Sequence, residues 1–315
     1  MRHACLTAAL VFRSLAYPAT YDLTGRIQPP AATPVFLHGA TFPFEASVLT
    51  GPDGRFRFRK LAAGTYTLAV TTAARGEALQ TVELSPGTVD AKGHLDILVK
   101  IDTTRLESDN ARASGTTVST VVLSIPDRAV KEYQEAQRCL SRRDTVCAIA
   151  HLRHSVEIAP RFAAAWNQLG TIEYQARRYG DAETNFREAL NADGQAFEPL
   201  VNLGGVLLNL ERPRDALSYN REAVASRPND ALANSQLGLT YFDLNDLVQA
   251  EKYLKTAVRL DPAHFSHPQL VLSDIYVRRG DWPAAIAALR EFLAVHPDSP
   301  QAAEIRKEIA DLSQR

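Results

Sequence analysis

A period of 34 residues runs through the second half of the chain. The residues that end successive periods are Pro160, Gly194, Pro228, Pro262 and, after 35 residues, Pro297. The same register recurs at alanines 148, 182, 216 and 250, and at three Leu-Gly pairs that begin at residues 169, 203 and 237. Each period holds two short amphipathic stretches joined by a turn, so the repeating unit is a helical hairpin.

Packing explains why these residue types recur. Small residues such as Gly170 and Ala182 belong where two helices approach most closely, and Leu169 and Phe186 fill the space between them. A proline at the end of a repeat cannot continue the helix and therefore fixes the turn. Because a single hairpin cannot bury its apolar face alone, we expect the hairpins to stack into a solenoid.

The repeat resembles the tetratricopeptide repeat (TPR). The positions that carry the resemblance are Trp166, Leu169, Gly170, Tyr174, Ala182, Phe186 and Ala189. Within a solenoid over residues 126–315, five repeats fit at 129–162, 163–196, 197–230, 231–264 and 266–299, followed by a capping helix within 300–315. The first repeat has Glu135-Ala136 in place of Leu-Gly, so its first helix is expected to pack on the front domain or the linker.

Residues 21–102 are expected to form an all-β antiparallel sandwich. The stretch Gly51-Pro52-Asp53-Gly54 predicts a hairpin turn, because Pro-Asp-Gly supplies a preset φ and a position for positive φ. Phe56 and Phe58 alternate with arginines, so both rings should face inward. Tyr66, Leu68 and Val70 are likewise expected on one buried face.

The segment from Gly51 to Val70 is similar to the carboxypeptidase regulatory-like domain, a transthyretin-like sandwich. This resemblance implies a non-catalytic module that is common in exported bacterial proteins. The polar residues that follow, 103–125, are interpreted as a linker, and residues 118–125 as either an extra strand or an extended strap.

The first 20 residues have the pattern of a signal peptide. Arg2 precedes a short apolar run, and Ser14-Leu15-Ala16 offers small residues for cleavage. Export is therefore favoured over a cytoplasmic location, and the alternatives are a frayed N-terminus or a misplaced start codon. No apolar run approaches the ~20 residues of a membrane-spanning helix.

Charge and motifs argue against nucleic-acid binding and catalysis. The chain has 35 basic and 36 acidic residues, without the basic excess that phosphate binding requires. Phosphate-binding, dinucleotide-binding and nucleophile-elbow motifs are all missing from the sequence. We therefore expect no enzyme activity and no cofactor. Arg279-Gly280-Asp281 is interpreted as the tight turn of a repeat rather than as a recognition tripeptide.

His154 and Glu157 have the H-x-x-E spacing of zinc carboxypeptidases, and His151 adds a second imidazole one turn away. His154 and Glu157 lie on a repeat helix, where no third ligand or general base can be placed. Zinc sites need a cavity and supporting groups around the ligands, so no metal site is expected and a peptidase is the least favoured function. His264 and His267, beside the inserted residue, are interpreted as turn or groove residues.

Cys139 and Cys147 are eight residues apart, on either side of a helical turn. They are a candidate disulfide, which export would favour. The alternative is that both are small buried apolar residues. Cys5 would be lost with a cleaved signal peptide.

In TPR proteins the first helix of each hairpin lines a concave groove. The resemblance implies that this chain has the same groove. The groove residues it implies are Tyr133, Gln137, Leu140, Asn167, Thr171, Tyr174, Val201, Gly205, Leu208, Ser235, Leu239, Phe242, Leu270, Asp274 and Val277. They are mostly apolar, which suits an extended peptide or an amphipathic helix and not the basic clamp of chaperone-binding TPR domains. The alternative is that part of this surface packs on the protein's own sandwich or linker.

The function expected from these features is a scaffold or adaptor that binds a protein or peptide partner. In a second interpretation the sandwich binds a glycan or the cell envelope and the solenoid is a spacer. That interpretation requires an exposed aromatic platform, for which Phe36, Phe42 and Phe44 are the candidates.

Overall fold

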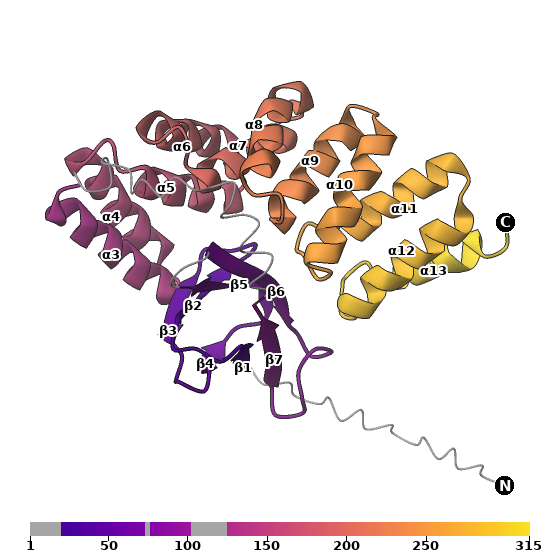
Figure 1. Cartoon of the computed structure of the whole chain (residues 1–315), viewed down its shortest axis with the longest axis horizontal. Coiled ribbons are helices and arrows are strands. Elements are labelled where there is room, and N and C mark those ends of the chain that lie inside the picture. The colour runs from indigo at the N-terminus through magenta and orange to yellow at the C-terminus, as the bar shows by residue number, and fades with distance from the viewer. Residues whose placement is uncertain (1–19, 73–75, 102–124) are drawn as a thin grey trace, which may run out of the picture.

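The computed structural model describes residues 20–72, 76–101 and 125–315. In these residues an all-β domain is followed by an array of helical hairpins, which confirms the predicted two-domain fold (Figure 1). Residues 1–19, Cys5 among them, and residues 102–124 lie outside the described residues. The second range holds nearly all of the linker predicted at 103–125 and most of the strand or strap expected at 118–125.

Two sheets form the front domain. Its strands are β1 (Tyr21–Gln28), β2 (Pro34–Gly39), β3 (Glu45–Leu49), β4 (Arg55–Leu61), β5 (Gly64–Thr72), β6 (Gly76–Leu84) and β7 (His94–Lys100). One sheet has the order β4-β1-β7 and the other β3-β2-β5-β6. All neighbouring strands are antiparallel except β1 and β7, which run parallel from Asp22–His94 to Gln28–Lys100.

Alternation along the strands builds the core between the sheets. Phe56 and Phe58 on β4 are 5% and 6% exposed, while the arginines that alternate with them face solvent. Tyr66 and Leu68 on β5 are fully buried in the same cluster. The inward faces predicted for β4 and β5 are therefore confirmed.

The predicted hairpin at residues 51–54 was wrong in its pairing. The turn itself forms, since the Gly54 N–H donates to the Gly51 carbonyl at 2.9 Å and Gly54 has φ +73°. However, β3 pairs with β2 in one sheet and β4 pairs with β1 in the other. The turn carries the chain across the sandwich, because the buried face of β4 packs from the sheet opposite β3.

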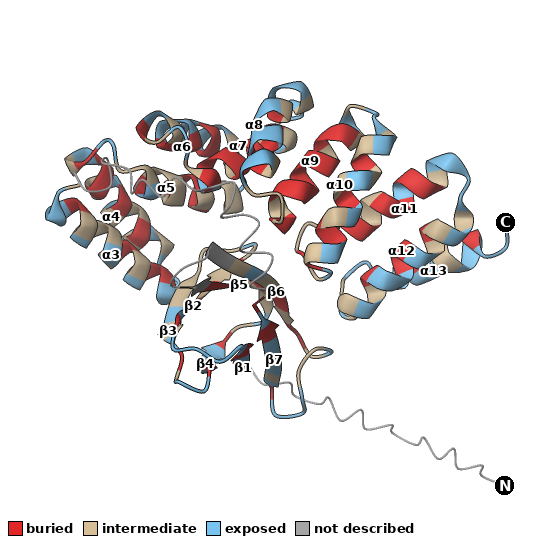
Figure 2. Ribbon diagram, in the orientation of Figure 1, coloured by how far each residue is buried: buried red, intermediate tan, exposed pale blue. Residues whose placement is uncertain are grey.

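Helices follow one another as antiparallel pairs. Their bounds are α3 (Asp127–Ser141), α4 (Thr145–Ile158), α5 (Ala163–Gln175), α6 (Tyr179–Ala192), α7 (Phe197–Asn209), α8 (Pro213–Ser226), α9 (Ala231–Asp243), α10 (Leu247–Leu260), α11 (Pro268–Arg279), α12 (Trp282–Val295) and α13 (Ala302–Leu312). Together they form an arch (Figure 1). Figure 2 shows α9 mostly buried and α8 much more exposed, so in this repeat and its neighbour the first helix of a hairpin contributes more to the core.

Close helix contacts occur where the repeat has glycine. A Cβ added at Gly170 would lie 2.6 Å from the Phe186 ring, and one at Gly204 would lie 1.8 Å from the Asn220 amide oxygen. The prediction that small residues mark these approaches is confirmed. Gly280, in the Arg-Gly-Asp turn, has φ +75° and ends α11 as its C-cap, which supports the structural interpretation of that tripeptide.

None of the helices in the described part of the chain combines the length and apolar character needed to cross a membrane.

Candidate functional site: the inner face of the helical arch

The sandwich lies beneath the arch, on its inner side (Figure 1). The first helices of successive repeats form this side, and α5, α7 and α9 pack against one another along it. The sandwich contacts the arch at two separate places, one in the first two repeats and one in the turns of the last repeats.

At the first place, Arg143 in the turn between α3 and α4 reaches the sandwich. Its guanidinium donates to the Tyr66 hydroxyl at 3.0 Å and lies 4.9 Å from the centre of the Phe42 ring and 5.6 Å from that of Phe44. Gln137 on α3 donates to a Glu45 carboxylate oxygen at 3.1 Å. Burial raises the pKa of Glu45, a shift that the hydrogen bond from Gln137 partly offsets.

At the second place, β6 meets the turns that precede α11 and α13. The Thr81 N–H donates to Asp261 at 3.0 Å, and the Gly87 N–H donates to Asp298. The His296 imidazole is 2.9 Å from a Glu83 carboxylate oxygen through Nδ1. Through Nε2 it is 3.3 Å from Nδ1 of His267. The His267 pKa is lowered to about 4, first by burial and then by His296.

These contacts identify part of the inner face as an intramolecular interface. Gln137, predicted to meet a partner, instead contacts the sandwich, as the self-packing alternative anticipated. Gln175 at the end of α5 also donates to the Gly39 carbonyl, at 3.1 Å. Phe42 and Phe44 lie against Tyr66 and Arg143, so two of the three rings proposed as a glycan platform belong to this interface.

Three residues predicted to line the binding groove are buried instead, so the prediction that they contact a partner is wrong. Leu140 is 0% exposed and packs between α3 and α4, and Val201 is 3% exposed in the core around α7. Ser235 is also 0% exposed, and its hydroxyl is 2.6 Å from that of Ser266. At these positions neighbouring segments of the array cover the side chain, so a partner cannot reach it. Gly205 is covered in the same way, by the Gln236 amide 2.4 Å from an added Cβ.

Four predicted residues are half-buried and make contacts within the array. Asn167 accepts from Asn202 at 3.0 Å, and the Tyr174 hydroxyl accepts from Asn209 at 3.0 Å. These two bonds join α5 to α7. The Thr171 hydroxyl donates back to the Asn167 carbonyl, and the Tyr133 ring packs 5.2 Å from that of Phe162.

Six predicted residues, Tyr174 among them, define a surface that we call the central inner face. It comprises Tyr174, Leu208, Leu239, Phe242, Leu270 and Val277. All six are half-buried apolar or aromatic residues at the edge of a core cluster. The Arg278 guanidinium lies 4.3 Å from the centre of the Phe242 ring. This combination of aliphatic side chains, rings and one cation can bind an amphipathic peptide segment.

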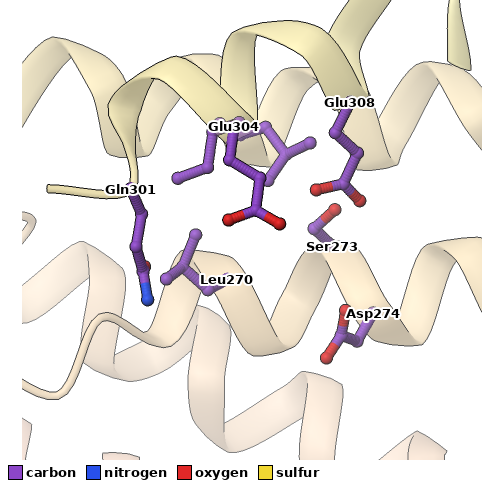
Figure 3. Close-up of a pocket in the computed structure, with 8 residues that line it drawn as sticks. Leu270, Ser273, Asp274, Gln301, Glu304 and Glu308 are labelled. Atoms are coloured by element: carbon purple, nitrogen blue, oxygen red, sulfur yellow. The ribbon is translucent and has the colours of Figure 1, made fainter. Parts of the chain in front are cut away.

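The inner face ends in a pocket of about 210 Å³ between α11 and α13 (Figure 3). Its lining residues are Leu270, Ser273, Asp274, Leu289, Gln301, Glu304, Ile305 and Glu308. Burial raises the pKa of Asp274, and burial together with Asp274 and Glu304 raises that of Glu308. Asp274 was predicted from the sequence, whereas Glu304 and Glu308 were missed because α13 was interpreted only as a cap.

Cys139 and Cys147 are joined by a disulfide across the turn between α3 and α4, with Cα atoms 5.8 Å apart. This pairing is one of the two alternatives left open by the sequence. His151 lies beside the pair, with its ligand atom within 4.8 Å of both sulfurs. Because the sulfurs are bonded to each other, they are not free thiolate ligands.

The histidine of the H-x-x-E pair and its neighbour His151 both lie against a carboxylate of α3. Glu132 on α3 contacts both imidazoles, with one oxygen 2.7 Å from His151 Nδ1 and the other 3.3 Å from His154 Nδ1. These contacts lower the pKa of Glu132, the hydrogen bond with His151 being the main cause. His154 therefore pairs with a carboxylate of the preceding helix, and the three side chains link α3 to α4.

Comparison with known protein families supports the assignment of the helical hairpins to the tetratricopeptide repeat. Models of the tetratricopeptide repeat family match residues 201–265 and 241–309. These residues therefore carry tetratricopeptide repeats, as the sequence period predicted. The crystal structure of PilW, described as a widely conserved type IV pilus biogenesis factor, has the same helical fold. It aligns with a TM-score of 0.53 and 20% identity, over 59% of this chain and 86% of that one.

Two curated relatives match parts of the chain. The type IV pilus assembly protein PilF of Pseudomonas aeruginosa is 29% identical over 126 residues, which are 39% of this chain and 49% of that protein. Anaphase-promoting complex subunit 3 of Schizosaccharomyces pombe is 21% identical over 168 residues, which are 53% of this chain and 23% of that protein. The chain thus spans less than half the length of either relative.

Proposed function

We propose that the protein is a non-catalytic scaffold that binds an apolar segment of a protein partner on the central inner face. The observation that carries the proposal is the half-buried apolar row on α5, α7, α9 and α11, which takes no part in the contacts with the sandwich described above. Solenoids use such extended inner surfaces for binding, and aromatic anchors supply much of the binding energy. The relatives named for pilus and complex assembly support this class of function.

The sandwich, in this proposal, limits how much of the arch a partner can contact. It fixes the two ends of the inner face through Arg143 and through Asp261 and His296. A partner would then enter between these fixed points, toward Leu239 and Phe242. The resemblance of the sandwich to the carboxypeptidase regulatory-like domain and the signal-like N-terminus support the further proposal that the protein is exported from a bacterial cell.

The second interpretation, glycan or envelope binding by the sandwich, has less support. Phe42 and Phe44 face the arch, and Phe36 stacks on His38 with ring centres 6.3 Å apart. One half-exposed ring does not provide the broad platform that this interpretation requires.

Site-specific photocrosslinking in the full chain tests the proposal. A photoreactive residue at Leu239, on the central inner face, is compared with one at Val248, which is 70% exposed on α10. We expect a discrete crosslinked partner in extract of the native host from position 239 and none from position 248. The partner should be lost when Phe242→Ala is added and retained when Val248→Ala is added. The same bands from both positions, or no band from position 239, would contradict the proposal.

A further inference from the structure

The register of the repeat continues into α13 and makes the end of the inner face acidic. Glu304 and Glu308 follow Leu270 and Asp274 by 34 residues, the spacing that relates equivalent residues of neighbouring repeats. α13 therefore presents to the pocket the same two positions that the repeats present to the inner face, with carboxylates in both (Figure 3). The last pocket of the inner face thus differs in chemistry from the apolar surface that precedes it.

The pocket combines an apolar wall with charged groups. Leu270, Leu289 and Ile305 supply aliphatic surface. The carboxylates of Glu304 and Glu308 point from α13 toward α11 (Figure 3), and Asp274 lines the pocket from α11. No Lys or Arg lines the pocket among the described residues. Arg278 is a cation near the pocket, and its charge opposes the rise in the pKa of Asp274. Its guanidinium lies 4.3 Å from the centre of the Phe242 ring. The pocket therefore has an excess of negative charge.

Ser273 gives a second and independent indication of a ligand. Its side chain lines the pocket and is 1% exposed, yet its hydroxyl has no hydrogen-bond partner among the described residues. The three preceding repeats have glycine at this position, Gly170, Gly204 and Gly238. A buried hydroxyl without a partner costs free energy, so a serine here indicates that a polar group completes its bonding.

We propose that this pocket binds an ammonium or guanidinium group on an alkyl stem, supplied by a lysine or arginine side chain of the protein partner. The methylene groups would lie on Leu270, Leu289 and Ile305, as long basic side chains commonly lie on apolar surface. The cation would donate to the carboxylates of Asp274, Glu304 and Glu308 and to the Ser273 oxygen. Only the source of this side chain, a protein partner, rests on the proposed function. Cation binding by the pocket can be tested without a partner.

Methyl NMR of the full chain tests the pocket directly. The Ile305, Leu270 and Leu289 methyl groups report on the pocket during titration with n-butylamine, n-butylguanidine and, as a neutral control, n-butanol. We expect saturable shifts of these methyl signals with the two cations and not with the alcohol. The Glu304→Gln/Glu308→Gln variant should weaken cation binding by about tenfold or more, because charged hydrogen bonds are lost.

Two further variants separate binding from folding. Glu188→Gln/Glu222→Gln changes the charge equally at exposed residues of α6 and α8, and we expect unaltered binding. Ser273→Ala should weaken binding several-fold without lowering stability, because it removes a buried hydroxyl that has no partner in the free protein. Equal responses to amine and alcohol, or equal affinities in the two glutamine variants, would overturn the proposal. So would a Ser273→Ala variant that is destabilised but binds normally.

Failure of this pocket and failure of the scaffold function have different signatures. If the pocket does not bind cations, crosslinking from Leu239 is still expected. In that case only the proposal that a basic side chain of the partner enters the pocket is wrong. If crosslinking fails while the butylammonium shifts are present, the pocket binds a cation that does not come from a protein held on the central inner face.

Discussion

Arg143 donates a hydrogen bond to the hydroxyl of Tyr66 across 77 residues of sequence, at 3.0 Å. Tyr66 is fully buried in the sandwich core, and Arg143 lies in the turn of the first helical hairpin with φ +61°. One side chain therefore connects the core of the first domain to the first repeat of the second. This connection makes the two domains one structural unit at that end of the arch.

Loss of the Arg143 side chain should loosen this connection. We expect Arg143→Ala to lower the free energy of unfolding by about 1 kcal/mol, since one hydrogen bond and the cation–π contacts with Phe42 and Phe44 are lost. Arg177 provides the matched control, because it has φ +60° in the equivalent turn one repeat later, where it is exposed. Urea unfolding measures the stability, and small-angle X-ray scattering should show a larger radius of gyration for Arg143→Ala only. Equal effects of the two substitutions would contradict a specific docking contact.

Acid should weaken the second contact through His267. In the folded protein its pKa is lowered to about 4, mainly by burial, whereas the ordinary value is 6.5. The unfolded state therefore binds the proton more readily between these values, so stability is complete above about pH 6.5 and falls as the pH is lowered toward 4. His264, with a pKa of about 3, contributes with the same sign.

His267→Asn should reduce this acid sensitivity, because asparagine tolerates the left-handed conformation of residue 267, φ +51°, and carries no titratable group. Urea unfolding of both proteins at several pH values between 7 and 4 measures the two slopes. If the slopes are the same, protonation of His267 does not contribute to the acid sensitivity.

The disulfide should stabilise the first repeat. Cys139 and Cys147 close a loop with a sequence separation of 8, for which chain entropy gives about 2–3 kcal/mol. We expect Cys139→Ser/Cys147→Ser, or reduction of the native protein, to lower the free energy of unfolding by this order. Reductant should have no effect on the double variant, and mass spectrometry of the alkylated native protein should show no free thiol at either position. Alkylation of both cysteines without reduction would contradict the bond.

Helix packing predicts opposite effects for two glycines. An alanine Cβ at Gly170 would lie 2.6 Å from the buried Phe186 ring, so Gly170→Ala should destabilise the protein by about 1–3 kcal/mol. At Gly180 on α6, an added Cβ meets nothing within 4 Å, and Gly180→Ala should gain up to about 1 kcal/mol of helix stability. Thermal and urea unfolding of the two variants measure both signs. Destabilisation of equal size would show that the close approach at Gly170 does not matter.

Local pattern allowed the elements of both domains to be predicted. The 34-residue period placed the hairpins because each repeat uses the same contact, such as Gly170 against Phe186. Period-two alternation likewise placed Phe56 and Phe58 in the sandwich core. These patterns arise from contacts that are repeated or close in sequence, so they are visible without a structure.

Docking between the domains leaves no such pattern. Glu83 and His296 are 213 residues apart, and neither has a sequence feature that distinguishes it from other polar residues of its domain. The residues with which the sandwich touches the arch were therefore missed, and Gln137 was assigned to a partner instead. Glu304 and Glu308 are different, because their spacing from Leu270 and Asp274 is readable in the sequence once α13 is treated as part of the repeat register.

The acidic pocket should reduce stability at neutral pH in the absence of its ligand. Burial, Asp274 and Glu304 raise the pKa of Glu308, so the folded state holds this proton more tightly than the unfolded state. Above the raised pKa the ionised group opposes folding, and the penalty disappears as the pH falls below the ordinary value. Glu308→Gln should therefore stabilise the free protein at pH 7, by less than about 1 kcal/mol for a group this close to solvent.

The gain should vanish near pH 4, where Glu308 of the native protein is already protonated in the folded state. Cation binding should weaken over the same pH range, because protonation of Asp274 and Glu308, whose pKa values are both raised, removes negative charge that attracts the ligand. Urea unfolding and butylamine titration at pH 7 and pH 4 measure the two effects, with Glu188→Gln as the control. A Glu308→Gln variant that is less stable than the native protein at pH 7 would mean that Glu308 stabilises the cap helix and does not serve a ligand.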